Sequence, residues 1–251
     1  MRLLRAEGCL TPDLANGQIL AAMARVGVFR LGGTVVGTQA FRHYDGVLGI
    51  CFSADQAAQT QDVDVASFER LSVALQDRVE ERLADVFGAL KFEPVPSADP
   101  GRAWRWRQTE QETLVEFLTP SFDESEGLKE LPALGVAAQS LHFLNYLIAR
   151  PIKVPLLYRS GVLIQVPRAE RYAIHKLIVA DRRLHGPEAA KARKDRAQSA
   201  FLIRFLAEEQ PDLIADAYAT ALGNGPSWRA AIARSLARMP ETKMPLDALP
   251  A

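Results

Sequence analysis

Two aspartates, Asp62 and Asp64, are the residues whose spacing most directly suggests chemistry. Side chains two positions apart on a β-strand project from the same face, so both carboxylates would lie together while Val63 and Val65 enter the core. Carboxylates held this close repel each other unless a cation lies between them, and hard oxygen ligands suit Mg²⁺. A solvated edge strand with two aspartates would give the same pattern, so the pair needs support from elsewhere in the chain.

A third acid, Glu116, lies in the apolar segment 113–118, which we expect to be a strand paired with residues 104–107 as a hairpin. A carboxylate there must either reach the solvated face of the strand or meet a cation, because burying it alone costs too much. The chain therefore offers a third oxygen ligand, or an acid on an outward strand face.

A glycine turn, Gly32-Gly33-Thr34, follows the short apolar run 28–31. We expect a buried strand over 28–31 and a helix from Thr34 to about Tyr44, with the turn between them. Small side chains at such a turn let a triphosphate approach exposed backbone N–H groups, and Thr34 would cap the helix. An ordinary tight turn has the same composition.

The order of these motifs resembles the nucleotidyltransferase superfamily, the DNA polymerase beta-like fold. FRLGGT over 29–34 is similar to its Gly-Gly or Gly-Ser turn, TQDVDVA over 60–66 to its Asp-x-Asp pair, and VEFLTP over 115–120 to its third acid. The segments 171–177 (RYAIHKL) and 193–196 (RKDR) are similar to helical motifs of AbiE-type toxin nucleotidyltransferases. The resemblance extends over roughly residues 27–206.

The resemblance implies a metal-dependent transfer of a nucleoside monophosphate from a nucleoside triphosphate. Asp62, Asp64 and Glu116 would be catalytic and would bind Mg²⁺ or Mn²⁺. The cofactor-binding residues would be Gly32, Gly33, Thr34 and Lys176, which would hold the nucleotide phosphates.

Three departures from the family pattern affect these assignments. The loop between Gly33 and Asp62 is longer than in the toxin relatives, so Gly37-Thr38 is an alternative phosphate turn. The third acid is Glu where many relatives have Asp. The lysine that precedes Gly-Gly in the toxin set is replaced by Leu31. Separately, Lys176 has an alternative interpretation as an ordinary solvated lysine on a helix.

The remaining chain fits an α+β protein in two parts. We expect a nucleotidyltransferase catalytic domain over residues 1–167, with an N-terminal helix and a mixed β-sheet flanked by helices. A C-terminal helical domain follows over 168–251, and further expected elements are a long helix over 68–87, a loop over 121–131 and a hairpin over 157–166.

Composition sets outer limits on the function. The chain has 251 residues, 48% hydrophobic, with 30 basic and 30 acidic side chains, which argues against a disordered protein and a strongly basic nucleic-acid coat. No apolar run approaches the roughly 20 residues needed to span a bilayer. With no secretion signal in the first ten residues, we expect a cytoplasmic protein in which Cys9 and Cys51 are reduced thiols.

Two other functions compete with nucleotidyl transfer. One is a catalytically quiet nucleotide-binding or interaction module of the same fold, of the kind that could belong to a toxin–antitoxin pair. The other is a Mg²⁺ phosphohydrolase that uses the same acids, although the sequence shows no separate general base. The acceptor, whether protein, RNA or small molecule, and the preferred base are not encoded in these motifs.

Overall fold

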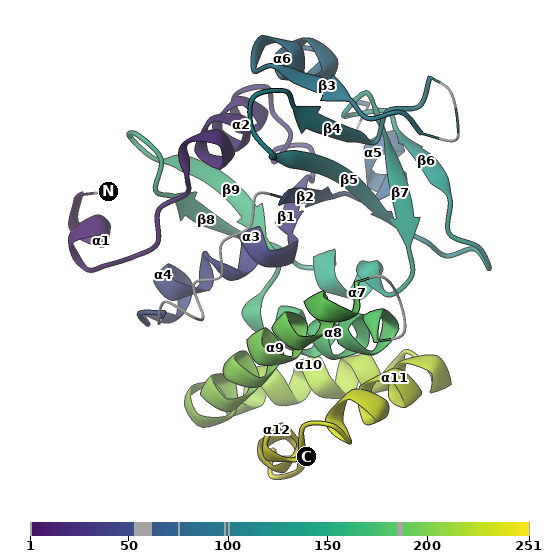
Figure 1. Cartoon of the computed structure of the whole chain (residues 1–251). Coiled ribbons are helices and arrows are strands. Elements are labelled where there is room, and N and C mark those ends of the chain that lie inside the picture. The colour runs from purple at the N-terminus through teal and green to yellow at the C-terminus, as the bar shows by residue number, and fades with distance from the viewer. Residues whose placement is uncertain are drawn as a thin grey trace. The chain divides into compact units, whose positions relative to one another are not determined.

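The computed structural model describes residues 2–52, 62–74, 76–97, 99, 101–184 and 188–250. The chain forms two compact units, residues 1–167 and 168–251 (Figure 1). The first unit is a mixed α/β structure and the second is helical, as the sequence predicts for an α+β protein.

A mixed sheet, seven-stranded within the described residues, organises the first unit (Figure 1). Its strands follow the order β1-β2-β5-β4-β3, and β7 pairs with both β5 and β6. The strands are β1 (Thr34–Val36), β2 (Asp62–Ala66), β3 (Phe92–Pro94), β4 (Arg105–Gln108), β5 (Leu114–Pro120), β6 (Leu128–Leu131) and β7 (Val136–Leu141). A separate hairpin joins β8 (Ile152–Leu156) to β9 (Val162–Val166).

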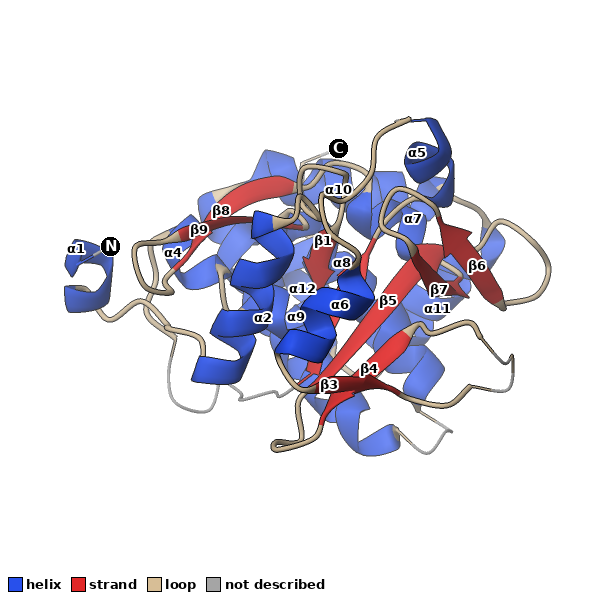
Figure 2. Ribbon diagram, turned by 90° about the horizontal axis from the view of Figure 1, so that it is seen from above, coloured by secondary structure: helices blue, strands red, loops and turns tan. Residues whose placement is uncertain are grey.

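Helix α6 (Leu83–Ala89) covers one face of this sheet, with α2 (Leu14–Arg25) packed beside it. The helices of the first unit are α1 (Arg2–Ala6), α2 (Leu14–Arg25), α3 (Gly37–Phe41), α4 (Tyr44–Leu48), α5 (Glu69–Ala74), α6 (Leu83–Ala89) and α7 (Leu144–Ile148). Figure 2 shows α2 and α6 crossing in front of the strands. Phe87 of α6 packs against Trp106 and Phe117, with ring centroids 4.9 and 6.1 Å away. This aromatic cluster fixes which face of β4 and β5 points inward.

The second unit contains five helices within the described residues: α8 (Ala169–Arg183), α9 (Ala189–Glu209), α10 (Pro211–Gly223), α11 (Pro226–Leu236) and α12 (Pro240–Asp247). The last three begin with proline, whose fixed φ and missing N–H suit the first helical turn. Helices α8 and α9 pack together, and hydrogen bonds from Tyr172 to Gln198 and from Ser199 to the carbonyl of Ala173 join them. The fully buried core of this unit includes Leu177, Ile178, Leu202, Ile203 and Leu206. No helix in the described part of the chain is long and apolar enough to cross a membrane.

Two local predictions near the glycine turn are wrong. Residues 26–32 form turns and no strand, with positive φ at Gly27 and Gly32 and a bond from Leu31 N to Gly27 O. Thr34–Val36 is a strand instead of the start of a helix, because these β-branched residues pair with residues 64–66 of β2. The helix begins only at Gly37.

The long helix expected over 68–87 is also wrong. It is replaced by α5 and α6 with an extended connection between them, where Gln76 has φ +48° and Val79 N donates to Ala133 O. Leu75, which the prediction placed in the apolar stripe, lies outside the described residues. The end of the loop expected over 121–131 is strand β6, whereas the 104–118 hairpin is confirmed as β4 paired with β5.

Candidate functional site

The paired aspartates lie on β2, in the middle of the sheet. Val63 and Val65 are fully buried, whereas Asp62 and Asp64 on the opposite face are half-buried. The apolar side chains therefore hold β2 in one orientation, and both carboxylates point away from the helices that cover the other face.

Glu116 lies next to Asp64. Strands β2 and β5 run parallel, and their register pairs Asp64 with Glu116 and Asp62 with Leu114. Paired residues on neighbouring strands share a face and lie about 4.8 Å apart along the hydrogen-bonding direction. The fold thus brings the predicted acids of the site to one face of two adjacent strands.

Arg105, a basic residue of the segment 104–107, lies on the other side of Glu116. The antiparallel register of β4 and β5 pairs Arg105 with Glu116, and the guanidinium Nη1 lies 3.5 Å from Glu116 Oε1. The guanidinium carbon also lies 4.3 Å from the centre of the Trp104 ring, a cation–π arrangement. The alternation Trp104-Arg105-Trp106 signalled the strand, but its partner register was needed to place Arg105 beside an acid.

Gly37 lies on the β1 side of Asp64, against its carboxylate. Val36 at the end of β1 pairs with Asp64, and the chain then turns at Gly37 with φ +64°. A Cβ at this position would collide with Oδ2 of Asp64. Glycine is required twice here, for the positive φ and for the approach of the carboxylate. Thr38 follows as a buried residue at the start of α3.

Gly32, Gly33 and Thr34 lie at the opposite end of β1. Thr34 pairs with Ala66, at the end of β2 away from Asp62, and its hydroxyl faces Gly32 O at 3.4 Å. A Cβ at Gly33 would lie 2.8 Å from Val28 O, so this glycine serves the packing of the preceding turn. The structure therefore brings Gly37-Thr38 to the carboxylates and does not bring Gly32-Gly33-Thr34 there; the phosphate-binding role of the latter stays a prediction.

Lys176 lies on α8 in the second unit and is 5% exposed. Its ammonium group contacts Asp195 Oδ1 of α9 at 2.5 Å, and Arg183 Nη1 contacts Asp195 Oδ2 at 2.7 Å. Burial of Asp195 by itself would raise its pKa, but the charges of Lys176 and Arg183 outweigh burial and lower it. Asp195 is therefore an anion, held by two cations within its own unit.

His175 is buried beside this cluster and has a strongly lowered pKa. Burial is the main cause and the charge of Lys176 adds to it, which brings the pKa to about 3. The imidazole is therefore neutral at physiological pH, which favours a structural role over proton transfer.

The acids on β2 and β5 form a group that we call the β2–β5 row: Asp62, Asp64 and Glu116. Its donor chemistry fits a divalent cation, because carboxylate oxygens are the ligands that Mg²⁺ and Mn²⁺ prefer. Within the described ranges, however, no three His, Cys, Asp or Glu side chains converge closely enough to hold a metal ion. The strand register brings the three acids to one face, and their carboxylates would have to adopt other rotamers for all three to bind one ion.

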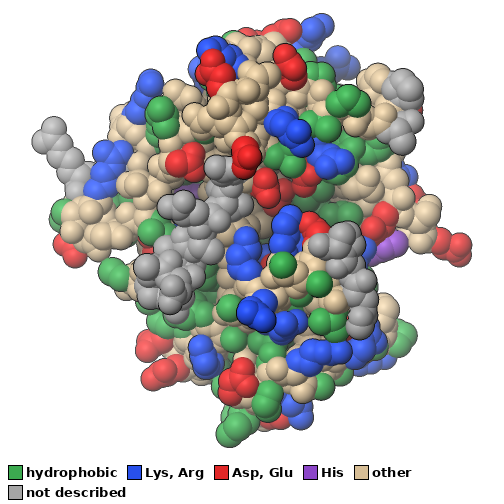
Figure 3. All heavy atoms as spheres, in the orientation of Figure 1, with side chains coloured by type: hydrophobic (Ala, Val, Ile, Leu, Met, Phe, Trp, Pro, Cys, Tyr) green, Lys and Arg blue, Asp and Glu red, His purple; other side chains and the backbone are tan. Residues whose placement is uncertain are grey.

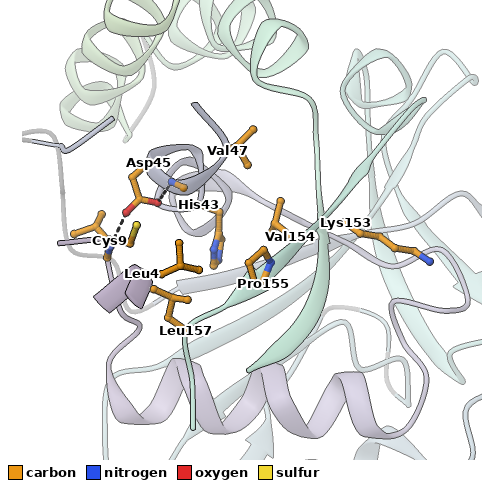
Figure 4. Close-up of a pocket in the computed structure, with 11 residues that line it drawn as sticks. Leu4, Cys9, His43, Asp45, Val47, Lys153, Val154, Pro155 and Leu157 are labelled. Atoms are coloured by element: carbon orange, nitrogen blue, oxygen red, sulfur yellow. Dashed lines mark hydrogen bonds between the residues drawn. The ribbon is translucent and has the colours of Figure 1, made fainter. Parts of the chain in front are cut away.

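A cavity of about 230 Å³ lies elsewhere in the first unit, between the N-terminal segment, α4 and β8 (Figure 4). Asp45 closes one side by accepting the N–H groups of Leu10 and Gly46, both at 2.5 Å. Burial, with a smaller effect of Arg42, lowers the pKa of His43 on its wall to about 4. The side chain of Lys153 points away from the other labelled residues (Figure 4), so the polar side chains around the cavity are those of His43, Asp45 and Cys9.

Charges of both signs are interspersed over the face of the molecule in Figure 3, which agrees with the zero net charge. A family model described as "Nucleotidyltransferase" matches residues 15–223. The chain belongs to this nucleotidyltransferase family. The match includes every residue of the β2–β5 row and Lys176, so nucleotidyl transfer is the general activity that the family indicates.

Family membership agrees with the fold, a mixed sheet followed by C-terminal helices. No match was found among curated proteins or among solved structures. The nucleotidyltransferase model does not distinguish an AbiE-type relative from others, and it identifies no acceptor.

Proposed function

We propose that the chain transfers a nucleoside monophosphate from a nucleoside triphosphate to a hydroxyl-bearing acceptor, with a divalent cation at the β2–β5 row. The observation that carries this proposal is the register of β2 and β5, which sets Glu116 beside Asp64 on the face that also carries Asp62. Family membership supplies the reaction class. Mg²⁺ or Mn²⁺ bound by these three carboxylates would stabilise negative charge on the reacting phosphate.

The remaining roles concern the triphosphate and the two parts of the chain. Gly37 and Thr38 would accommodate the triphosphate beside Asp64, in preference to Gly32-Gly33-Thr34, because a glycine without Cβ is required there. Lys176 would bind phosphate as a point charge, provided that a nucleotide competes with its ion pair to Asp195. Residues 1–167 would be the catalytic domain and residues 168–251 the helical domain.

The direct test measures transfer and not binding alone. Triphosphates labelled at the α-phosphorus are incubated with Mg²⁺ or Mn²⁺ and with protein, RNA and small-molecule acceptors, and pyrophosphate release is followed in parallel. We expect Asp64→Asn to lower transfer by at least about 100-fold while the fold is retained. Transfer that persists in an Asp62→Asn, Asp64→Asn double variant would remove this site from consideration.

A second candidate function is a nucleotide-binding module with little turnover, of the kind that could belong to a toxin–antitoxin pair. The observation in its favour is that, in the described part of the chain, no three acidic, His or Cys side chains converge on one point. Triphosphate binding measured by calorimetry, without labelled product on any acceptor, would favour this module over the transferase. Release of phosphate without an acceptor would instead indicate a hydrolase.

A further inference from the structure

The residues of the site lie in a line across the sheet, with a glycine at one end and charged side chains along the rest. In the order of the strands it reads Gly37 after β1, Asp64 on β2, Glu116 on β5 and Arg105 on β4. Successive strands are about 4.8 Å apart, so Arg105 lies about 10 Å from Asp64 on the side away from Gly37. The two ends of the site therefore carry different chemistry, a glycine turn at one and a cation at the other.

Nucleotidyl transfer assigns these ends to different substrates. The attacking hydroxyl forms a bond to the α-phosphorus as the bond to pyrophosphate breaks, and the two oxygens are roughly in line. If the triphosphate tail lies over Gly37, pyrophosphate leaves toward β1 and the attacking hydroxyl approaches from β5 and β4. The acceptor then approaches the end of the site that carries Arg105.

The surroundings of Arg105 fit an anion better than a base. The Trp104 face is already covered by the guanidinium at 4.3 Å, so a nucleobase cannot stack there without displacing it. The contact with Glu116, at 3.5 Å, is longer than a good hydrogen bond, and the Arg105 side chain is 38% exposed. Among the described residues no other partner of the guanidinium is seen, which leaves most of its donors facing solvent.

We infer that Arg105 is the acceptor-binding residue of this site and that the acceptor carries a phosphate group next to the hydroxyl that attacks. This inference rests on the proposed function, because it needs the triphosphate over Gly37. Trp104 fixes the plane of the guanidinium, and a planar fork of N–H donors binds phosphate oxygens in a bidentate manner. The phosphate could belong to the 3′ end of an RNA or to a small phosphomonoester.

The first experiment measures binding and needs no turnover. A 5′-fluorescein hexaribonucleotide and glycerol 3-phosphate are the probes, followed by anisotropy and by calorimetry with Mg²⁺ present. We expect Arg105→Gln to weaken binding of one or both probes about tenfold and Arg105→Lys to weaken it less, because lysine keeps the charge without the fork. Arg107→Gln is the matched control, since Arg107 is on the same strand and face but pairs with Leu114.

The second experiment separates acceptor from donor. Calorimetry of a non-hydrolysable triphosphate should give the same dissociation constant, within about twofold, for the wild type and Arg105→Gln. In a transfer assay, Arg105→Gln should raise KM for the acceptor and leave KM for the triphosphate unchanged. Equal weakening of both substrates, or labelled product only on phosphate-free acceptors, would overturn the inference. So would a wild type that binds neither probe.

The two proposals fail in different ways. Phosphate-probe binding that depends on Arg105, without transfer to any acceptor, would support the acceptor site and contradict the transferase. Transfer that requires Asp64 but is indifferent to Arg105 would support the transferase and contradict the acceptor site.

Discussion

Replacing Gly37 with alanine tests the geometry of the site at one atom. Alanine at φ +64° costs about 1–2 kcal/mol because the left-handed region crowds its Cβ. The same Cβ would collide with Asp64 Oδ2, so the carboxylate must move. A misplacement of about 1 Å near reacting atoms costs on the order of 100-fold in rate. We expect Gly37→Ala to lower the free energy of unfolding by about 2 kcal/mol and transfer by about 100-fold.

Two other glycines are the controls. Gly33→Ala would place a Cβ 2.8 Å from Val28 O, and overpacking of this kind costs about 1–3 kcal/mol, with transfer per folded molecule retained. Gly46→Ala, in α4, meets no atom within 4 Å and should leave both quantities unchanged. Urea unfolding gives stability, and Mn²⁺ titration followed by electron paramagnetic resonance gives metal affinity.

The outcome distinguishes the two glycine turns. If Gly37→Ala keeps the metal affinity and the turnover of the wild type, the contact with Asp64 has no functional role and the reasoning from the row is refuted. If Gly33→Ala loses turnover while it stays folded, the phosphate turn lies at Gly32-Gly33 after all.

Three further predictions concern stability. Asp195→Asn should lower the free energy of unfolding in urea by about 3–5 kcal/mol, because Lys176 is left nearly buried without its carboxylate. The additional substitution Lys176→Met should recover part of this loss. An unchanged free energy of unfolding would contradict the ion pair. His175 has a pKa of about 3 when folded, below its unfolded value, so its contribution to stability is lost as pH falls. From pH 7.5 to 4.5 the wild type should lose about 2.5 kcal/mol more than His175→Gln, because the variant still contains His43 with its lowered pKa. Phe87→Ala should cost about 3–5 kcal/mol in the same assay, and a cost below 1 kcal/mol would contradict its place in the core.

A regular period predicted some elements from the sequence and misled for others. Residues 62–66 alternate clearly, and β2 is found there. Residues 28–31 form a buried turn, and a buried strand would have the same apolar composition. Periodicity cannot distinguish the two structures in so short a run. The stripe over 68–87 has helical spacing, but bonds from Val79 and Glu80 to residues distant in sequence hold the segment extended.

The candidate acids were identifiable because an acid between apolar strand residues is unusual, whereas their cationic neighbour was not. Arg105 looks like any outward arginine of a hairpin until the order of the strands is known. Strand order depends on pairings between segments distant in the chain, such as Asp62 with Leu114 and Val36 with Asp64, which no local pattern encodes. The preference for Gly37-Thr38 likewise required the pairing of Val36 with Asp64.

The site is positioned by the buried side chains behind it. Val63 and Val65 alternate with Asp62 and Asp64, and Phe117 follows Glu116, so the packing that fixes the inner face also sets the register of the carboxylates. A slip of one residue between β2 and β5 would turn Glu116 toward the core, where a lone carboxylate is prohibitively costly. The hydrophobic core and the proposed chemistry therefore select the same strand register.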